Sequence, residues 1–210
     1  MLLNQADTDS SSVLYETTFG GGGGMGASHF WDVNWGMGLD ITYSYQGQRK
    51  NYGLDDTTFF DGFVDVQLQY VKIPVTAMYR NDSDTRFRYT AALGPMLMFL
   101  LEGRRIYSET EFYTEAAGDV TDEYNMVNWG LYTSHGIGYR LGEKIWLNLN
   151  FRADWAISDA ENKSALIYNQ LTQTADVYPA DRPKTHNVIL GASLGAQISF
   201  GPKGPKVVRK

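Results

Sequence analysis

Cysteine is absent from this sequence of 210 residues, and histidine occurs only three times. No disulfide can form, and exported bacterial proteins often avoid stray thiols. His29, His135 and His186 lack the close spacing of metal ligands. The glycine run 20–24 is not followed by the lysine and serine of a phosphate loop. We therefore expect no metal and no cofactor.

The sequence also lacks a long apolar run and an excess of positive charge. No stretch of about 18 apolar residues occurs, which excludes a helical membrane protein. The net charge of −6 argues against nucleic acid as a partner, because phosphate binding needs a basic face. Residues 1–7 show neither the basic nor the apolar region of a signal peptide, so the sequence is mature, truncated or not exported.

What the sequence does have is strict alternation of apolar with polar or glycine residues. It is clearest over 31–45, where odd positions are aromatic or aliphatic and even positions are Asp, Asn, Gly, Thr or Ser. A period of two predicts a β-strand. At about 3.3 Å per residue this strand is long enough to cross a bilayer when tilted. A half-buried soluble strand would explain the alternation but not this length.

Four further segments show the same alternation, and two are less regular. The regular ones are 87–101, 127–141, 145–157 and 188–200. In 64–80 the apolar phase changes, and we expect a β-bulge near Tyr70 and Val71 to repair the slip, with Pro74 at a weakly paired position. Segment 13–27 contains the glycine run, which we interpret as a strand in a narrow barrel rather than a linker.

The joints between these segments alternate in length. They are short near His29, at 81–85 and at 142–144, and long at 48–63, 103–125 and 158–185. Short turns at one end and long loops at the other are typical of an outer-membrane barrel. The segments number seven, whereas bacterial single-chain barrels have even numbers of strands. We therefore expect an eighth strand, either upstream of Met1 or supplied by another chain.

Several phrases resemble the PorT-like outer-membrane barrels of Bacteroidota. They are Tyr70-Val71-Lys72-Ile73-Pro74-Val75, with Lys72 where an acidic residue is commoner, then Tyr43-Ser44-Tyr45-Gln46-Gly47, Ala91-Ala92-Leu93-Gly94-Pro95, and Gly130 with Gly136-Ile137-Gly138-Tyr139. Their order and spacing agree with that family. The resemblance implies an eight-stranded barrel made with a signal peptide, and the name-giving member serves type IX secretion. It implies little chemistry, since most such proteins have no assigned activity.

Two sets of side chains are expected to mark the barrel wall. The charged residues on the polar phase should fill the lumen, and we expect them to pair and plug it rather than line a pore: Glu16, Asp40, Lys72, Arg80, Arg88, Glu102, Arg104, Arg140, Arg152 and Asp154. The second set is an aromatic girdle at the two headgroup levels, Trp31, Trp35, Tyr43, Tyr45, Trp129, Tyr139 and Trp155. Phe200 ends the last strand.

We interpret the chain as all-β: one transmembrane antiparallel up-and-down β-barrel domain over 1–210, with strands within 13–200 and a basic tail at 201–210. We expect a non-enzymatic subunit of an envelope complex for secretion or uptake, in the bacterial outer membrane, with the lipid bilayer and neighbouring outer-membrane or periplasmic proteins as partners. Two alternatives stay open. One is a lipocalin-like ligand-binding barrel, and the other is a hydrolase whose loop rim carries His186 with Asp181 or Asp159.

Overall fold

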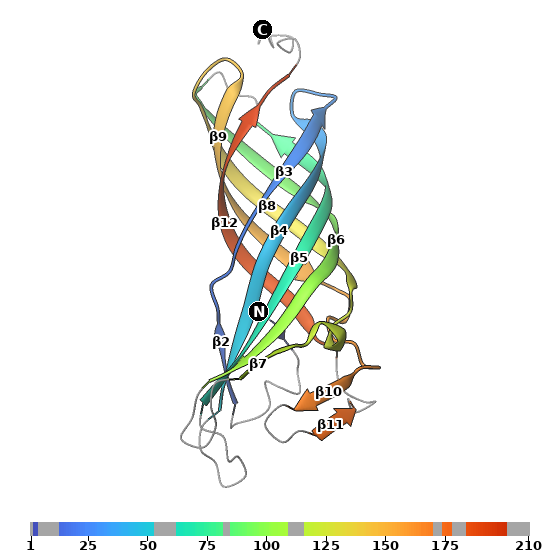
Figure 1. The fold of residues 1–210 in the computed structure, drawn as a ribbon. Coiled ribbons are helices and arrows are strands. Elements are labelled where there is room, and N and C mark those ends of the chain that lie inside the picture. Colours follow the sequence, from blue (N-terminus) through green and yellow to red (C-terminus); the bar gives the residue numbers. More distant parts are fainter. Residues whose placement is uncertain are drawn as a thin grey trace.

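The computed structural model describes residues 2–3, 13–52, 62–81, 85–108, 116–169, 174–177 and 184–200. Long strands form a tall curved sheet (Figure 1). Its strands are β1 (Leu2–Leu3), β2 (Val13–Thr17), β3 (Gly21–Phe30), β4 (Trp35–Tyr52), β5 (Gly62–Arg80), β6 (Phe87–Tyr107), β7 (Ala116–Asp119), β8 (Val127–Arg140), β9 (Ile145–Ala156) and β12 (His186–Ile198). A 3-10 turn, η1 (Thr121–Glu123), and a small hairpin, β10 (Leu166–Asn169) with β11 (Thr174–Val177), lie at the long-loop end.

The wall strands follow one another around the sheet, each antiparallel to the next. The order is β12, β9, β8, β6, β5 and β4, and both β2 and β3 then pair with β4. The turns 31–34 and 141–144 lie at the upper end in Figure 1, and the long connections lie at the lower end. The all-β, up-and-down prediction is therefore confirmed. The seven long strands form a half-barrel, because β3 and β12 do not pair in the described part of the chain.

The predicted strand over 13–27 is present but broken. Residues 18–20 separate β2 from β3, and the glycines from Gly21 onward do form a strand. A Cβ on Gly22 or Gly24 would collide with a main-chain carbonyl of β4, so only glycine permits this close approach. Trp31, placed in a strand by its alternation, instead lies in the turn 31–34, and His29 lies within β3 rather than in a turn.

The phase change in segment 64–80 has a different cause from the expected bulge. Strand β5 keeps one phase throughout, with its even-numbered residues inside. Towards the long-loop end its inner residues are apolar, and towards the short-turn end its outer residues are apolar. The register shift does fall beside Gln69 and Tyr70, but the additional residue is Leu101 on β6. Pro74 lies where expected, because the β5–β6 ladder is interrupted directly after it.

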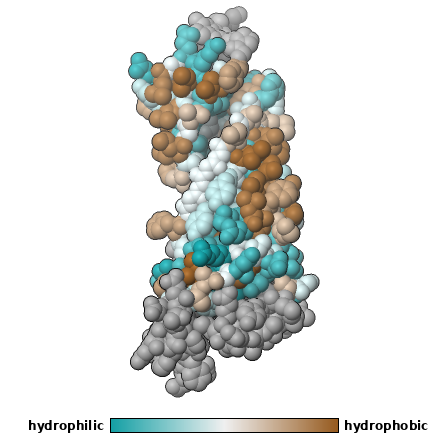
Figure 2. Space-filling view, in the orientation of Figure 1, coloured by the Kyte–Doolittle hydropathy of each residue, from teal (hydrophilic) through white to brown (hydrophobic). Residues whose placement is uncertain are grey.

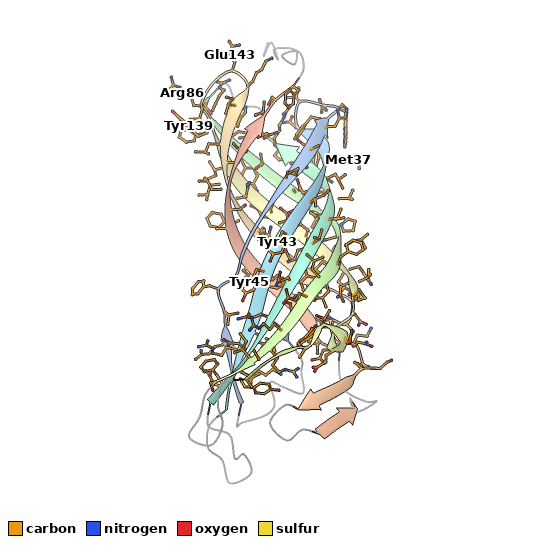
Figure 3. All side chains as sticks on the ribbon, in the orientation of Figure 1. Met37, Tyr43, Tyr45, Arg86, Tyr139 and Glu143 are labelled. Carbon is orange, nitrogen blue, oxygen red and sulfur yellow. The ribbon has the colours of Figure 1, made fainter. Side chains whose placement is uncertain are left out.

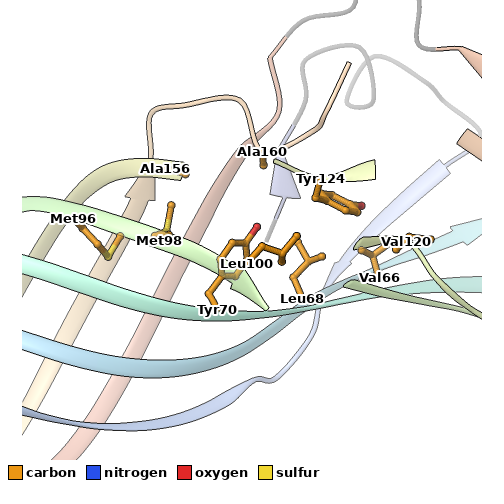
Figure 4. Packing of buried hydrophobic residues seen from close by; sticks show 10 residues of the cluster. All are labelled: Val66, Leu68, Tyr70, Met96, Met98, Leu100, Val120, Tyr124, Ala156 and Ala160. Carbon is orange, nitrogen blue, oxygen red and sulfur yellow. The ribbon is translucent and has the colours of Figure 1, made fainter. Parts of the chain in front are cut away.

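The long-loop half of the barrel has a hydrophobic interior. Ten buried residues from the wall strands and from the segments that cross the barrel end form one cluster (Figure 4): Val66, Leu68, Tyr70, Met96, Met98, Leu100, Val120, Tyr124, Ala156 and Ala160. Tyr132 packs against this cluster from the lumen side. The cluster closes the long-loop end of the lumen, and this part of the sheet is built like a soluble protein.

The short-turn half has the opposite arrangement, with large apolar side chains outside. Its exposed residues include Met37, Leu39, Ile41, Val75, Leu93, Leu97, Ile137, Leu149, Phe151, Leu190 and Leu194. Figure 2 shows hydrophobic side chains gathered along the flanks of the wall on one face, with hydrophilic ones towards both ends. An exposed apolar surface of this extent marks contact with hydrocarbon. We call it the apolar band.

Candidate functional site: the lumen and its closure

An ion pair crosses the lumen on the short-turn side of the hydrophobic cluster. Lys72 Nζ on β5 donates to Asp154 Oδ2 on β9 at 2.7 Å, and the two side chains are 1% and 2% exposed. Arg152 Nη2 lies 3.4 Å from the same carboxylate oxygen. A buried charge is tolerated only when paired, so these residues neutralise one another. The pair ties together two strands that are not neighbours in the sheet.

Further toward the short turns, Arg88 is held by a second group. Its guanidinium stacks over the Trp146 ring at 4.1 Å and donates to Gln197 Oε1 at 2.5 Å. The Arg140 guanidinium lies 5.6 Å from the centre of the same ring. These contacts join β6, β8, β9 and β12, so the inward polar residues fix the curvature of the half-barrel.

Arg80 lies at the rim of the short-turn end. Its guanidinium lies 3.9 Å from the centre of the Phe30 ring, and its Nε donates to the Val33 carbonyl at 2.9 Å. Asp40 and Arg152, both on the inner phase, line the groove between this rim and the ion pair. Of the ten residues predicted for the lumen, the structure places seven on the inner face: Asp40, Lys72, Arg80, Arg88, Arg140, Arg152 and Asp154.

Three residues predicted for the lumen lie outside, and for them the prediction is wrong. Glu16 is exposed and pairs opposite Arg49 on the outer face. Glu102 and Arg104 follow the bulge at Leu101, which moves the even-numbered residues of β6 from the inner to the outer face. Each error results from one additional residue, since a strand's two faces exchange at such a point.

Glu102 takes part in an outer polar chain at the long-loop edge of the apolar band. The Tyr43 hydroxyl donates to Gln69 Oε1 at 2.7 Å, and Gln69 Nε2 donates to Glu102 Oε2 at 2.6 Å. Beyond this level Arg49 and Asp65 form an outer ion pair at 2.7 Å. The hydrogen bond with Asp65 raises the pKa of Arg49. The outer residues are polar at this level and apolar toward the short turns, and this change defines where hydrocarbon ends.

The predicted girdle residues lie at two levels. Figure 3 shows Tyr139 and Met37 near the short-turn end, and Tyr43 and Tyr45 about midway along the wall. Trp35 begins β4 and packs edge-on against Tyr79, with ring centres 5.2 Å apart. Trp129 and Trp155 lie close to the long-loop ends of β8 and β9, and Trp31 is exposed in its turn. Phe200 lies two residues beyond the end of β12 and is exposed.

Two of the three histidines, His135 and His186, make structural contacts. His135 faces the apolar band, where its Nδ1 lies 2.7 Å from the Tyr89 hydroxyl. His186 Nδ1 lies 3.1 Å from the Ala156 carbonyl. Asp159, its proposed catalytic partner, accepts from the Thr185 amide and lies 3.6 Å from Lys163 Nζ. Asp181 is outside the described residues. Within the described ranges no group of three metal-ligating side chains occurs.

The sequence does not predict the contacts that close the long-loop end, because its pattern indicates a long polar loop over 103–125. Strand β6 continues to Tyr107, and Arg105 makes a two-armed ion pair with Glu123 of η1 at 2.5 Å. Burial disfavours the charge of Arg105, but Tyr124 and Glu123 outweigh it and raise its pKa. Burial also raises the pKa of the Tyr124 phenol. The pairing of β6 with β7 brings Arg105 and Glu123 together, and the sequence pattern of a single strand does not contain this pairing.

Comparison with known families gives one match. The model of the outer membrane protein beta-barrel domain matches residues 1–162. The chain belongs to this family. No curated protein and no solved structure matches the chain. Among the described residues no helix is long and apolar enough to cross a membrane.

Family membership places this outer-membrane barrel in the bacterial outer membrane. The lipocalin-like alternative is wrong, since that arrangement would put the apolar face inside and the charges outside. In the apolar band of this barrel, Leu39, Leu97 and Leu149 face outward, and the charges of Lys72 and Asp154 lie inside.

Proposed function

We propose that this outer-membrane barrel is a non-enzymatic, structural or accessory subunit of an envelope complex, such as a secretion or uptake machine. The carrying observation is the hydrophobic cluster that fills the lumen at the long-loop end. A lumen that is filled by packed side chains does not conduct. The parts of the barrel that remain available for binding a partner are its outer surface beyond the bilayer and the loops that follow its strands.

The wall strands beyond the apolar band support this proposal. Strands β4, β5 and β6 continue past the level of Glu102. The Arg49–Asp65 pair joins β4 to β5, and the Arg105–Glu123 pair joins β6 to η1. A rigid platform is a better base for a binding surface than mobile loops. The short phrases that resemble the PorT-like barrels of Bacteroidota point in the same direction by analogy, and type IX secretion is the function that the analogy suggests.

Site-specific photo-cross-linking in the native membrane tests the proposal. A photoreactive residue at Arg104, on the outer face beyond the bilayer, should yield a defined adduct with another envelope protein. The same residue at Leu97, on β6 within the apolar band, should yield no such adduct. A parallel recording in planar bilayers should show no channel. Stable conductance, or adducts at neither position, would contradict the proposal.

A further inference from the structure

A hydrogen-bonded pair of polar side chains lies on the outer face of the wall, within the apolar band. His135 Nδ1 on β8 lies 2.7 Å from the Tyr89 hydroxyl on β6, and the two rings are stacked with their centres 6.2 Å apart. His135 is exposed, and Tyr89 is 41% exposed. The outer residues beside them are apolar, and Ile137 and Phe151 are 57% and 60% exposed. Polar side chains that face hydrocarbon are costly and mark functional positions.

The depth of this pair follows from the aromatic residues towards the two ends of β8. Trp129 and Tyr139 are ten residues apart, which spans about 25 Å along the membrane normal at about 3.3 Å per residue and a tilt of about 40°. This is the usual height of the apolar band in a bacterial barrel. His135 is four residues from Tyr139 and six from Trp129, so it lies near the middle of the hydrocarbon. Acyl chains offer no hydrogen-bonding group at this depth.

The contact between the two side chains uses only one of their two polar hydrogens. A phenol carries one O–H, and a neutral imidazole carries one N–H and one bare nitrogen. If the Tyr89 hydroxyl donates to Nδ1, the hydrogen on His135 Nε2 is left over. If Nδ1–H donates to the Tyr89 oxygen, the phenol hydrogen is left over and Nε2 is a bare acceptor. Among the described residues no group bonds Nε2. In either tautomer one donor and one acceptor therefore face hydrocarbon.

We propose that a second copy of this chain covers this patch, through a two-fold contact between the Tyr89–His135 pairs of the two copies. Both copies have the same orientation in the outer membrane, so a two-fold axis along the membrane normal brings together residues of equal depth. His135 Nε2 of each copy then meets the Tyr89 oxygen of the other. The same two interchain contacts form in either tautomer. They close a cycle of hydrogen bonds in which every polar hydrogen of the two pairs is used.

The neighbours of the pair favour a close approach of two walls. Ala91 lies directly opposite His135 on β6, and Thr133 lies opposite Ala153 on β9. Small side chains such as these let two membrane-embedded surfaces approach closely, and the projecting Leu93 can pack against them. A different membrane protein would have to present a matching polar group at this one depth. A second copy carries that group at the required depth already.

Photo-cross-linking in the native outer membrane tests the proposed contact. A photoreactive residue at Phe151, which lies beside His135 on β9, should give an adduct between two copies of this chain. The same residue at Ile41, an exposed position on β4 that β5 and β6 separate from β8, should give none. The absence of such a dimer at Phe151, an adduct with a different protein in its place, or equal dimer yields at the two positions would overturn the proposal.

A dimerisation constant measured in lipid vesicles tests the hydrogen bonds themselves. Energy transfer between donor-labelled and acceptor-labelled copies reports the fraction of dimer as lipid dilutes the protein. His135→Phe and Tyr89→Phe each remove both interchain bonds and should weaken the dimer about tenfold. Both substitutions place apolar groups toward hydrocarbon, so the fold should be retained.

Thr133→Val is the matched control for these variants. It removes a hydroxyl from the same outer face of β8 but none from the proposed cycle, and it should leave the dimerisation constant unchanged. If His135→Phe and Tyr89→Phe leave the dimer as tight as Thr133→Val does, the Tyr89–His135 pair does not hold two copies together and the proposal fails.

Discussion

Lys72 Nζ and Asp154 Oδ2 are 2.7 Å apart, although their strands are separated in the wall by β6 and β8. The contact therefore spans the lumen rather than joining neighbours. It lies between the hydrophobic cluster and the open polar groove, so it is where the two halves of the interior meet.

Removal of one partner of this pair should destabilise the barrel strongly. Lys72→Met leaves the Asp154 carboxylate buried without its principal partner, and the expected loss is about 3–5 kcal/mol in the free energy of unfolding. Urea titration of the barrel in lipid vesicles measures it. The double variant Lys72→Met/Asp154→Leu should recover most of the loss. If the double variant is as unstable as the single one, the residues do not act as a pair.

Charged substitutions on β5 should distinguish the apolar band from the wall beyond it. Val75 and Gln67 both face outward, Val75 on the short-turn side of the Gln69–Glu102 contact and Gln67 on its long-loop side. Val75→Arg should cost about 2–4 kcal/mol, the penalty for arginine near the bilayer midplane. Gln67→Arg should change stability by less than about 0.5 kcal/mol, as for ordinary surface positions. The same urea titration compares them, and similar losses would show that the level is misplaced.

The hydrophobic cluster should respond to substitution like the core of a soluble protein. Leu68 is 1% exposed, and Leu68→Ala should cost about 2–5 kcal/mol, since a cavity remains where the side chain was removed. Ile73→Ala, on the outer face of the same strand, leaves a gap that lipid can fill and should cost less. If the order of the two losses is reversed, the cluster does not stabilise this end.

Asp119 gives a pH dependence that can be assigned to one contact. Thr121 donates to Asp119 Oδ1 from its hydroxyl at 2.6 Å and from its amide at 2.8 Å, and these bonds lower the pKa of the Asp119 carboxyl. A carboxyl group whose pKa is lower in the folded state than in the unfolded state stabilises the fold at pH values above its unfolded pKa. This stabilisation is lost as the pH falls through the folded-state pKa. Thr121→Val should raise the pKa of Asp119 in an NMR titration, whereas Thr121→Ser should not.

The sequence predicts the lipid-facing residues best, because hydrocarbon imposes one rule on every strand that crosses it. Alternation in 31–45 and 145–157 therefore identified Leu39, Ile41 and Leu149 correctly. Beyond the bilayer the apolar residues lie on the inner face instead of the outer one. The apolar residues Val66 and Leu68 therefore give the sequence pattern of β5 an apparent change of phase, although the strand itself has none.

The misplaced charges have a local cause that alternation cannot detect. Glu102 lies after the bulge at Leu101, and Glu16 lies before the break at 18–20. A bulge is stabilised by pairing with the neighbouring strand, which a single-strand pattern does not contain. For the same reason the meeting of Arg105 with Glu123 could not be predicted.

The most direct test of the central claim is the depth of outer-face residues in a bilayer. Single cysteines at Ile73 and Gln67 on β5, each carrying a fluorophore, would be compared in vesicles that contain brominated lipid. We expect strong quenching at position 73 and little at position 67, because the apolar band ends between them. Equal quenching at both positions, or greater quenching at 67, would contradict an outer-membrane barrel whose faces exchange at the level of Gln69 and Glu102.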